Sequence, residues 1–387
     1  MKSTIWIFAI ILTITIYLQW SFVGISTGNY YYVIIFFIFL LLLFKNQILV
    51  NYKILWFLVF SLISIIFNKI PAFFRPYERF ISFIIVMGLI GPLIINSNLL
   101  FFRNSLFKVF NTFLILLVVL SFLGIILRIP EMIGRGGVVG FFRHSMILSP
   151  LAGISTLLTL NYGYYSTNKI KKISFWILSI ICFLTCIVGA SRVAILGVLT
   201  GSLFFLYTIF KGRFKHLVST ILIITVIGAL TYSVWEPFTE PFMKKIRYSE
   251  SRGDVIYTRR SIWNTRLTEF KSSPFIGIGF ASVSTENNKL FDEEGGQIEP
   301  GSSWMGVLSM TGFFGFIPLF LLLFQYLKLF YYEKENKMIK FLGSLFVFFV
   351  THMFAEGYII SAGSILFFYF WLVMGLIEEQ RRRILVK

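Results

Sequence analysis

Long apolar runs follow one another along almost the whole chain, and this repetition is what most restricts its fold. About twelve runs are long enough, or nearly so when tilted, to cross a membrane as helices. They cover residues 4–23, 30–44, 54–67, 80–95, 106–127, 144–162, 173–190, 192–210, 217–235, 302–327, 338–357 and 359–377. Charged side chains make up only 13% of the sequence and the mean hydropathy is +0.83, values that exclude a soluble domain. The sequence predicts an all-α polytopic membrane protein with about twelve transmembrane helices.

One long polar stretch interrupts the apolar runs and divides the chain into three parts. Residues 1–235 hold the first nine predicted membrane helices, and residues 302–387 hold the last three together with a basic tail. Residues 236–301 form a single long loop between them, and their mixture of polar and apolar residues predicts amphipathic helices in that loop.

Basic loops predict how the chain is oriented in the membrane. Every second loop carries lysine or arginine, as cytoplasmic loops do. These residues are Lys45, Lys53, Arg103, Lys108, Lys169, Lys171, Lys172, Lys211, Arg213, Lys215, Lys328, Lys334, Lys337, Lys340, Arg381, Arg382 and Arg383. With an even number of spans, both termini are then cytoplasmic and the long loop faces outward. This topology explains the formal net charge of +18, which therefore does not indicate a nucleic-acid partner.

Arginine is also concentrated in the loops predicted to face outward, where the topology rule does not require it. These arginines are Arg75, Arg79, Arg128, Arg135, Arg143, Arg192, Arg247, Arg252, Arg259, Arg260 and Arg266. Two interpretations are open: each contacts a phospholipid headgroup, or several converge on one polyanion. A diphosphate would best match the paired N–H donors of guanidinium groups. Arg192 is the strongest candidate, because it follows an almost loopless junction at the predicted membrane boundary, where a charge is costly.

Two arginines of the long loop fall on the apolar side of a helix predicted over residues 261–270. Arg259 and Arg266 are seven residues apart, so their side chains project in nearly the same direction. The residues predicted around them are Ile262, Trp263, Leu267 and Phe270. An ordinary interfacial helix keeps its cations on the polar side. The reversed placement indicates an anion bound at the membrane surface.

Other residues near the predicted outer surface have two interpretations each. Trp263 and Trp304 either stack on sugar rings or belong to the aromatic belt at the membrane interface. His352 and Glu356, one turn apart near the end of their predicted span, either serve an acceptor or make a structural hydrogen bond. The glycines of residues 134–140 either let the backbone approach a ligand or make a tight turn.

Three segments that carry several of these residues resemble the O-antigen ligase/polymerase superfamily. They are Gly140-Phe141-Phe142-Arg143-His144, Ala190-Ser191-Arg192-Val193-Ala194-Ile195-Leu196-Gly197, and Arg260-Ser261-Ile262-Trp263 with Ser273-Pro274-Phe275-Ile276-Gly277-Ile278-Gly279-Phe280. The resemblance implies a GT-C-type membrane glycosyltransferase at the outer face of the bacterial inner membrane, with no metal or other cofactor. It implies undecaprenyl-diphosphate-linked glycans as donor and acceptor, with membrane lipids and a chain-length regulator as further partners.

The end of the long loop departs from the pattern of the ligases in this superfamily. The ligases carry a His-Asn pair there, and the histidine is their proposed base, whereas this chain has Glu299-Pro300-Gly301-Ser302-Ser303-Trp304. This form resembles the repeat-unit polymerases, which build O-antigen, capsular polysaccharide or exopolysaccharide. Two alternatives are a ligase that moves glycan onto another acceptor and a transporter of lipid-linked glycans, which would place charges deep within several spans.

The resemblance also suggests roles for the candidate residues. In glycosyl transfer from a lipid diphosphate, negative charge builds up on the leaving group, so cations in a poorly hydrated site are needed. We assign Arg192 and Arg260 to that charge and Glu299 to the proton of the attacking hydroxyl, with a solvated carboxylate as the alternative for Glu299. The predicted substrate-binding residues are Arg75, Arg79, Arg143, Arg259, Arg266, Trp263, Trp304, His352 and Glu356.

Overall fold

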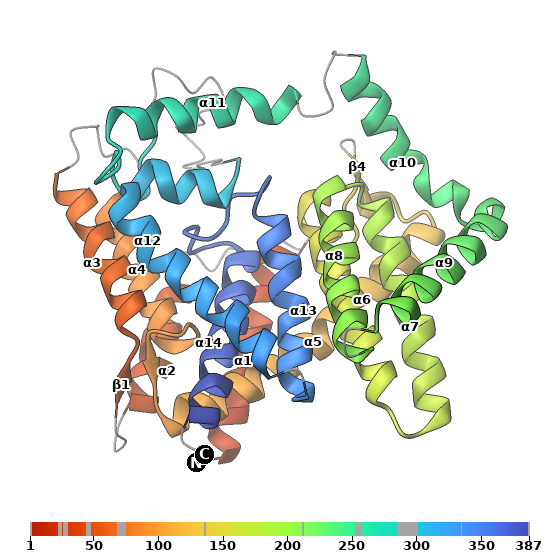
Figure 1. Ribbon diagram of the computed structural model, residues 1–387, viewed down its shortest axis with the longest axis horizontal. Helices are drawn as coiled ribbons and strands as arrows, with labels where there is room; N and C mark the ends of the chain where they lie inside the picture. The colour runs from red at the N-terminus through yellow and green to blue at the C-terminus, as the bar shows by residue number, and fades with distance from the viewer. Residues whose placement is uncertain are drawn as a thin grey trace.

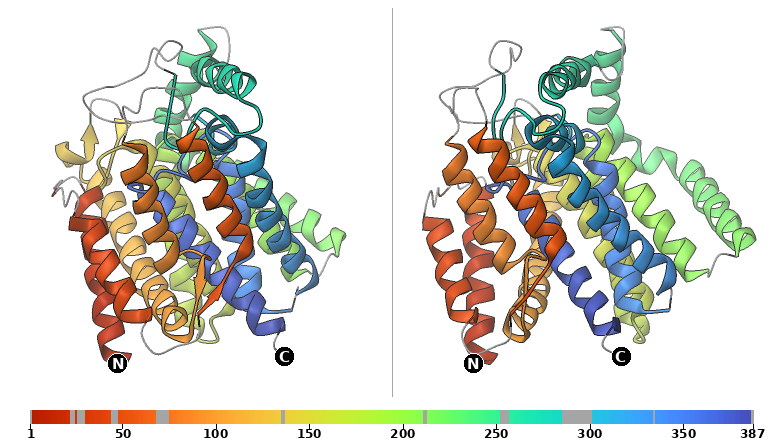
Figure 2. Two further views of the ribbon diagram at one scale, coloured as in Figure 1. Left: turned by 90° about the vertical axis from the view of Figure 1, so that its left-hand side faces the viewer. Right: turned by 60° about the vertical axis from the view of Figure 1, so that its left-hand side comes forward.

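Helices make up nearly all of the regular structure. The computed structural model describes residues 2–21, 25, 30–43, 48–67, 75–134, 137–210, 213–251, 257–284, 301–333 and 335–385. Within these ranges the α-helices are α1 Lys2–Trp20, α2 Tyr30–Leu43, α3 Tyr52–Ile66, α4 Pro76–Leu89, α5 Ser97–Ile126, α6 Ser145–Tyr165, α7 Lys169–Val188, α8 Arg192–Ile209, α9 Phe214–Leu230, α10 Tyr232–Glu250, α11 Tyr257–Ser272, α12 Ser303–Tyr332, α13 Lys337–His352 and α14 Ile365–Leu385. They form a bundle with both chain ends at one end and α11 at the other (Figure 1, Figure 2).

The helices follow the predicted apolar runs closely. Each of the predicted runs contains a helix, and the two remaining helices, α10 and α11, lie mainly in the long loop. Among the described residues, five helices are long and apolar enough to cross a membrane, namely α1, α5, α7, α8 and α12. Helices α2 and α3 are apolar but shorter. The chain is therefore a multi-pass α-helical membrane protein, while the total of twelve spans and the inward position of the termini remain predictions.

Two short pairs of antiparallel strands interrupt the helical pattern. Strand β1, Leu49–Val50, pairs antiparallel with β2, Ile94–Ile95, and β3, Ile133–Gly134, pairs antiparallel with β4, Gly137–Val138. A single 3₁₀ turn, η1, covers Pro130–Met132 just before β3. Strands of two residues are too short to give an alternating pattern, so the sequence alone could not predict them.

The basic residue Arg103 has a different role from the one predicted. Helix α5 starts at Ser97 rather than at residue 106, because the Asn96 side chain caps it by accepting from Leu99 N at 2.7 Å. This start places Arg103 inside the helix, where only 1% of its surface is exposed. Its guanidinium donates to three carbonyls near the end of α4, those of Gly88, Leu89 and Ile94. The prediction of a cytoplasmic loop cation was wrong, because the residue satisfies backbone groups inside the protein.

Helix α12 is broken, and a segment that follows α11 fills the break. Gly312 has φ 62° and ψ −168°, well outside the helical region. On one side of it Ile278 N donates to Ser309 O at 2.8 Å, and on the other Phe313 N donates to Pro274 O at 2.8 Å. Backbone groups freed inside a membrane protein need such partners. The segment 274–279 thus joins α11 to α12.

Glycines make this approach of two backbones feasible. A Cβ atom on Gly277 would overlap the carbonyl of Met310, and one on Gly312 would overlap the carbonyl of Phe275. Both glycines also have positive φ values, which side-chain-bearing residues rarely adopt. The Ser-Pro-Phe-Ile-Gly-Ile-Gly-Phe segment of the sequence therefore has a structural explanation.

Small residues also let α8 pack tightly against α13. A Cβ atom on Gly197 would lie 2.9 Å from the Phe348 ring, and one on Gly201 would lie 2.8 Å from Ser344 O. Small residues four apart are typical of a close-packing face on a membrane helix, and the partner of this face is α13. Because α13 runs from the end with the chain termini towards α11, this packing fixes the end of α13 relative to the start of α8 (Figure 1).

Candidate active site

Helix α11 presents two arginines on its buried face. Arg259 has 16% of its side chain exposed and Arg266 has none, so the prediction that they share the inward-facing side is confirmed. Arg260 is exposed on the opposite side. Leu267, expected among the inward-facing residues, is 41% exposed, so that part of the prediction was wrong.

Each inward-facing arginine meets a carboxylate of the protein. Arg259 Nη2 lies 2.6 Å from Glu356 Oε1, on the connection between α13 and α14. Arg266 Nη1 lies 2.8 Å from Glu269 Oε2, one turn along α11, and both side chains are almost completely buried. Glu269 was not among the predicted site residues, although an Arg and a Glu three residues apart on a helix are spaced to form an ion pair.

The Arg266–Glu269 pair anchors the chain that leaves α11. Glu269 Oε1 accepts a hydrogen bond from Ser284 N at 2.8 Å. Burial raises the pKa of Glu269 and lowers that of Arg266, because a charged group loses hydration in the protein interior. Because Arg266 is fully buried and pairs with a residue of its own helix, we interpret it as a structural residue.

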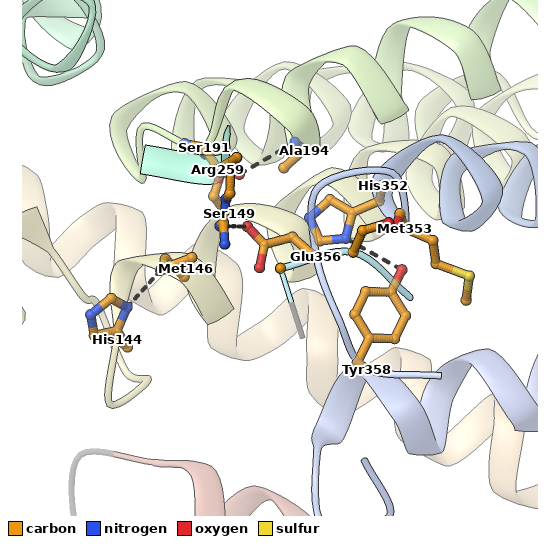
Figure 3. A network of polar contacts seen from close by, with 12 residues as sticks. His144, Met146, Ser149, Ser191, Ala194, Arg259, His352, Met353, Glu356 and Tyr358 are labelled. Carbon is orange, nitrogen blue, oxygen red and sulfur yellow. Dashed lines mark hydrogen bonds and ion pairs between the residues drawn. The ribbon is translucent and has the colours of Figure 1, made fainter. Parts of the chain in front are cut away.

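The connection between α13 and α14 was predicted as helix and is irregular instead. Helix α13 ends at His352 rather than at residue 357, and α14 starts at Ile365 rather than at residue 359. His352 and Glu356 therefore do not share a helix face and have different partners. Glu356 faces Arg259, whereas His352 Nδ1 lies 3.3 Å from the Tyr358 hydroxyl, as Figure 3 shows. This contact favours the structural interpretation of His352.

Two serines at the start of α12 hold that irregular connection in place. Ser303 Oγ donates to Glu356 O at 2.8 Å and accepts from Tyr358 N at 3.1 Å. Its backbone N–H also donates to Met353 O and Glu356 O, both at 3.0 Å. Ser302 caps α12 and donates to Met353 O at 3.2 Å. No role was predicted for either serine, although a serine before an apolar run is a typical helix-capping signal.

The turn between α7 and α8 positions Arg192. Ser149 of α6 accepts from Ser191 N at 3.4 Å and donates to Cys186 O at 2.7 Å, so the turn lies directly on α6. Ser191 caps α8, which makes the half-buried Arg192 its first residue. The positive end of the helix dipole repels a cation at a helix N-terminus. An anion bound there is attracted by the helix dipole and by the Arg192 side chain. Lys245 of α10 reaches the same turn and donates to Ala190 O at 3.3 Å.

The glycine-rich approach to α6 is explained by packing. Gly140 has φ 58°, and a Cβ atom there would lie 2.6 Å from Ser121 of α5. Ser121 Oγ also accepts from Phe141 N at 2.9 Å. The tight-turn interpretation is therefore favoured for Gly140. Arg143 and His144 follow it as exposed residues at the start of α6.

The remaining candidates are not brought to one place. Arg75 is 75% exposed and pairs with Glu78, and with Arg79 it lies at the start of α4, on the opposite side of the bundle from α8 (Figure 1). Arg75 and Arg79 therefore do not lie next to Arg192 in the fold. Glu299 lies outside the described residues, as do Arg135 and the acidic residues 292–294.

The two tryptophans behave differently from each other. Trp263 Nε1 donates to Gly301 O at 3.2 Å, which ties α11 to the start of α12. Trp304 is half-buried, its ring centre 6.1 Å from that of Phe354, and its indole N–H has no hydrogen-bond partner within the described residues. Stacking on a sugar therefore remains a prediction for Trp304, whereas Trp263 already has a structural contact.

No group of three His, Cys, Asp or Glu side chains in the described part of the chain is arranged to bind a metal ion. No curated protein matches the chain. A family model described as O-antigen ligase matches residues 177–320, which include the α7–α8 turn with Arg192, the whole of α11 and the serines that start α12. Over that part of the chain, this match supports the resemblance to the O-antigen ligase/polymerase superfamily.

Proposed function

We propose that this protein is a repeat-unit polymerase, a membrane glycosyltransferase that joins undecaprenyl-diphosphate-linked oligosaccharides into O-antigen, capsular polysaccharide or exopolysaccharide. It acts at the outer face of the bacterial inner membrane and without a metal. The match to the O-antigen ligase family model supports a membrane enzyme that handles lipid-linked glycans. The polymerase assignment rests on the Glu-Pro-Gly-Ser-Ser-Trp segment in place of the ligases' His-Asn.

The observation that carries the proposal is the arrangement of cations at the α11 end of the bundle. Arg192 starts α8, Arg259 of α11 reaches over the end of α13, and Lys245 of α10 contacts the α7–α8 turn. The three come from different helices, and the start of α8 adds the partial positive charge of its free N–H groups. Such a set matches a diphosphate better than it matches single phospholipid headgroups.

The proposed reaction forms one glycosidic bond and breaks one sugar–phosphate bond. A hydroxyl oxygen of the acceptor glycan attacks the anomeric carbon of the donor, and the lipid diphosphate leaves with the bonding electron pair. Arg192 and Arg259 neutralise the charge that accumulates on the diphosphate, with the exposed Arg260 and Arg143 nearer its entry. Glu299 is the base predicted for the hydroxyl proton.

In this scheme Glu356 and the diphosphate compete for the guanidinium group of Arg259. In the structure its Nη2 contacts Glu356 Oε1, and a bound phosphate would compete with that carboxylate for the guanidinium group. An incoming diphosphate must displace the carboxylate, since one N–H pair cannot serve two anions at full strength. The Ser303 hydrogen bonds keep the Glu356 backbone fixed meanwhile.

A ligase is the second candidate, because the matching family model is described as O-antigen ligase. The two functions differ in their product. Purified protein should be incubated with undecaprenyl-diphosphate oligosaccharide as the only glycan. A polymerase gives a ladder of longer lipid-linked glycans, whereas a ligase leaves the substrate unextended until a separate acceptor lipid or protein is added. Absence of longer glycans with active, folded protein would overturn the polymerase assignment.

A further inference from the structure

A hollow lies next to the turn that carries Arg192, and Lys245 of the proposed cation set forms part of its wall. It measures about 210 Å³ and lies between β4, the α7–α8 turn and α10. Val138, Val188 and Pro241 give it largely apolar walls, and Lys244 and Lys245 line it as well. An apolar hollow with cations at one side matches a molecule that has a charged head and an apolar tail.

Of the two lysines that line this hollow, Lys245 is the one that the fold holds in place. Its ammonium group is half-buried and donates to Ala190 O, at the turn that precedes Arg192. Neighbouring Lys244 differs, because its side chain is 71% exposed and pairs with Glu240 at 2.8 Å. Burial lowers the pKa of Lys245, and the nearby guanidinium of Arg192 lowers it further. Two cations held this close repel each other, and an anion between them would relieve the repulsion.

The hollow borders a helix that is long and apolar enough to cross a membrane. It is built in part from the end of α7, and the outer face of that helix exposes Trp176, Ile177 and Ile180. In a multi-pass protein such a face contacts lipid chains. A ligand with its phosphate at Lys245 can therefore extend its hydrocarbon chain from the hollow along α7 into the bilayer.

We propose that this hollow binds the lipid end of the polyprenyl diphosphate donor, with Lys245 contacting the phosphate attached to the lipid and the apolar walls contacting its first carbon atoms. Arg192, at the adjacent turn, then contacts the phosphate attached to the sugar. This inference rests on the proposed function, because the donor is the substrate of that reaction. It assigns the two ends of the diphosphate to different helices, α10 and α8.

The inference is tested by kinetics on purified protein in nanodiscs of uncharged lipid. Lys245→Gln should raise the KM for the lipid-linked donor at least tenfold and change kcat little, while Lys245→Arg should keep most of the affinity because it retains the charge. Val138→Trp fills the hollow without changing any charge and should raise the KM as well. Lys271→Gln, an exposed cation at the end of α11, is the matched control and should leave the KM unchanged.

Competition identifies the ligand. Undecaprenyl diphosphate should inhibit the wild-type protein far more strongly than inorganic pyrophosphate, and Lys245→Gln and Val138→Trp should both weaken that inhibition. Unchanged KM values in both variants would overturn the inference. Equal inhibition by vesicles of phosphatidylglycerol would overturn it too, since the hollow would then be an ordinary phospholipid site.

Direct binding separates this inference from the proposed function. Binding of radiolabelled undecaprenyl diphosphate is measured on wild type and on Lys245→Gln, without any reaction. Binding that depends on Lys245, in a protein that makes no longer glycan, would support the hollow and contradict the polymerase. If the protein makes longer glycan but binds undecaprenyl diphosphate equally well with and without Lys245, the polymerase is supported and the role of the hollow is contradicted.

Discussion

The two halves of α11 hold the same kind of residue in different surroundings. Arg266, in the second half, is fully buried and pairs with a carboxylate of its own helix. Arg259, in the first half, keeps 16% of its side chain exposed and pairs with a carboxylate on a distant connection. Periodicity puts both on one face and so suggests one role for both.

The difference lies in what each ion pair joins. Arg266 and Glu269 fix the segment that leaves α11, and both side chains are almost completely buried. Arg259 and Glu356 join two elements that come from distant parts of the chain, and both remain accessible. A buried pair within one helix is part of the scaffold, whereas an accessible pair between elements can exchange its partner.

The largest effect is expected for Arg266→Ala. It leaves Glu269 buried without its partner, and breaking a buried pair in this way costs about 3–5 kcal/mol of stability. Thermal unfolding in detergent should show a strongly lowered midpoint. The double variant Arg266→Met/Glu269→Leu is the control, because removing both charges should recover most of the loss. A stable Arg266→Ala protein without activity would instead show that Arg266 binds the substrate.

Arg259→Ala should have the opposite profile. Removing one group that stabilises a developing anion lowers kcat by roughly 10²–10³-fold, while the unfolding midpoint should hardly change. Arg259→Lys should recover only part of the activity, because a point charge does not replace a two-pronged donor. The measurement is the initial rate of glycan extension at saturating donor. A wild-type rate from either variant would place Arg259 with Arg266 as a structural residue.

A smaller effect is expected for Glu356→Gln. The amide still accepts a hydrogen bond from Arg259 but no longer competes as an anion, and an accessible charge pair contributes about 1 kcal/mol. The donor KM should therefore fall roughly fivefold. The KM is compared with wild type at one fixed ionic strength. A raised KM would mean that Glu356 positions Arg259 and does not compete with the diphosphate.

The smallest effect concerns pH and belongs to the scaffold half of α11. Burial raises the pKa of Glu269 in the folded protein, so the folded state binds this proton more tightly than the unfolded state does. The stabilisation is therefore complete below the usual carboxyl range and is lost as the pH rises through the raised pKa. The melting midpoint of wild type should fall over that window relative to Glu269→Gln. Parallel curves would show that Arg266 offsets the burial completely.

Much of this architecture could be predicted from the sequence, because it is set locally. Runs of apolar residues mark the helices, and the 3.6-residue period places Arg259 and Arg266 together. The spacing of Gly197 and Gly201 is typical of the close-packing face that α8 presents. Each of these signals lies within one segment, and the folded protein preserves it.

What could not be predicted depends on contacts between distant segments. Helix α13 ends at His352 because Ser303, some fifty residues earlier, binds the backbone that follows it. The partner of Arg259 is 97 positions away in sequence. Lys245 reached the α7–α8 turn without any motif to indicate it. Nothing in one sequence specifies such pairings.

The central claim is that Arg192 and Arg259, on different helices, act on the same diphosphate. A double-mutant cycle on kcat/KM for the lipid-linked donor tests it most directly, with Arg192→Ala, Arg259→Ala and the double variant. Residues that share one ligand are coupled, so the double variant should lose clearly less than the product of the two single losses. Two single losses that multiply without coupling would show that the arginines serve separate sites, and the account of one shared diphosphate would be contradicted.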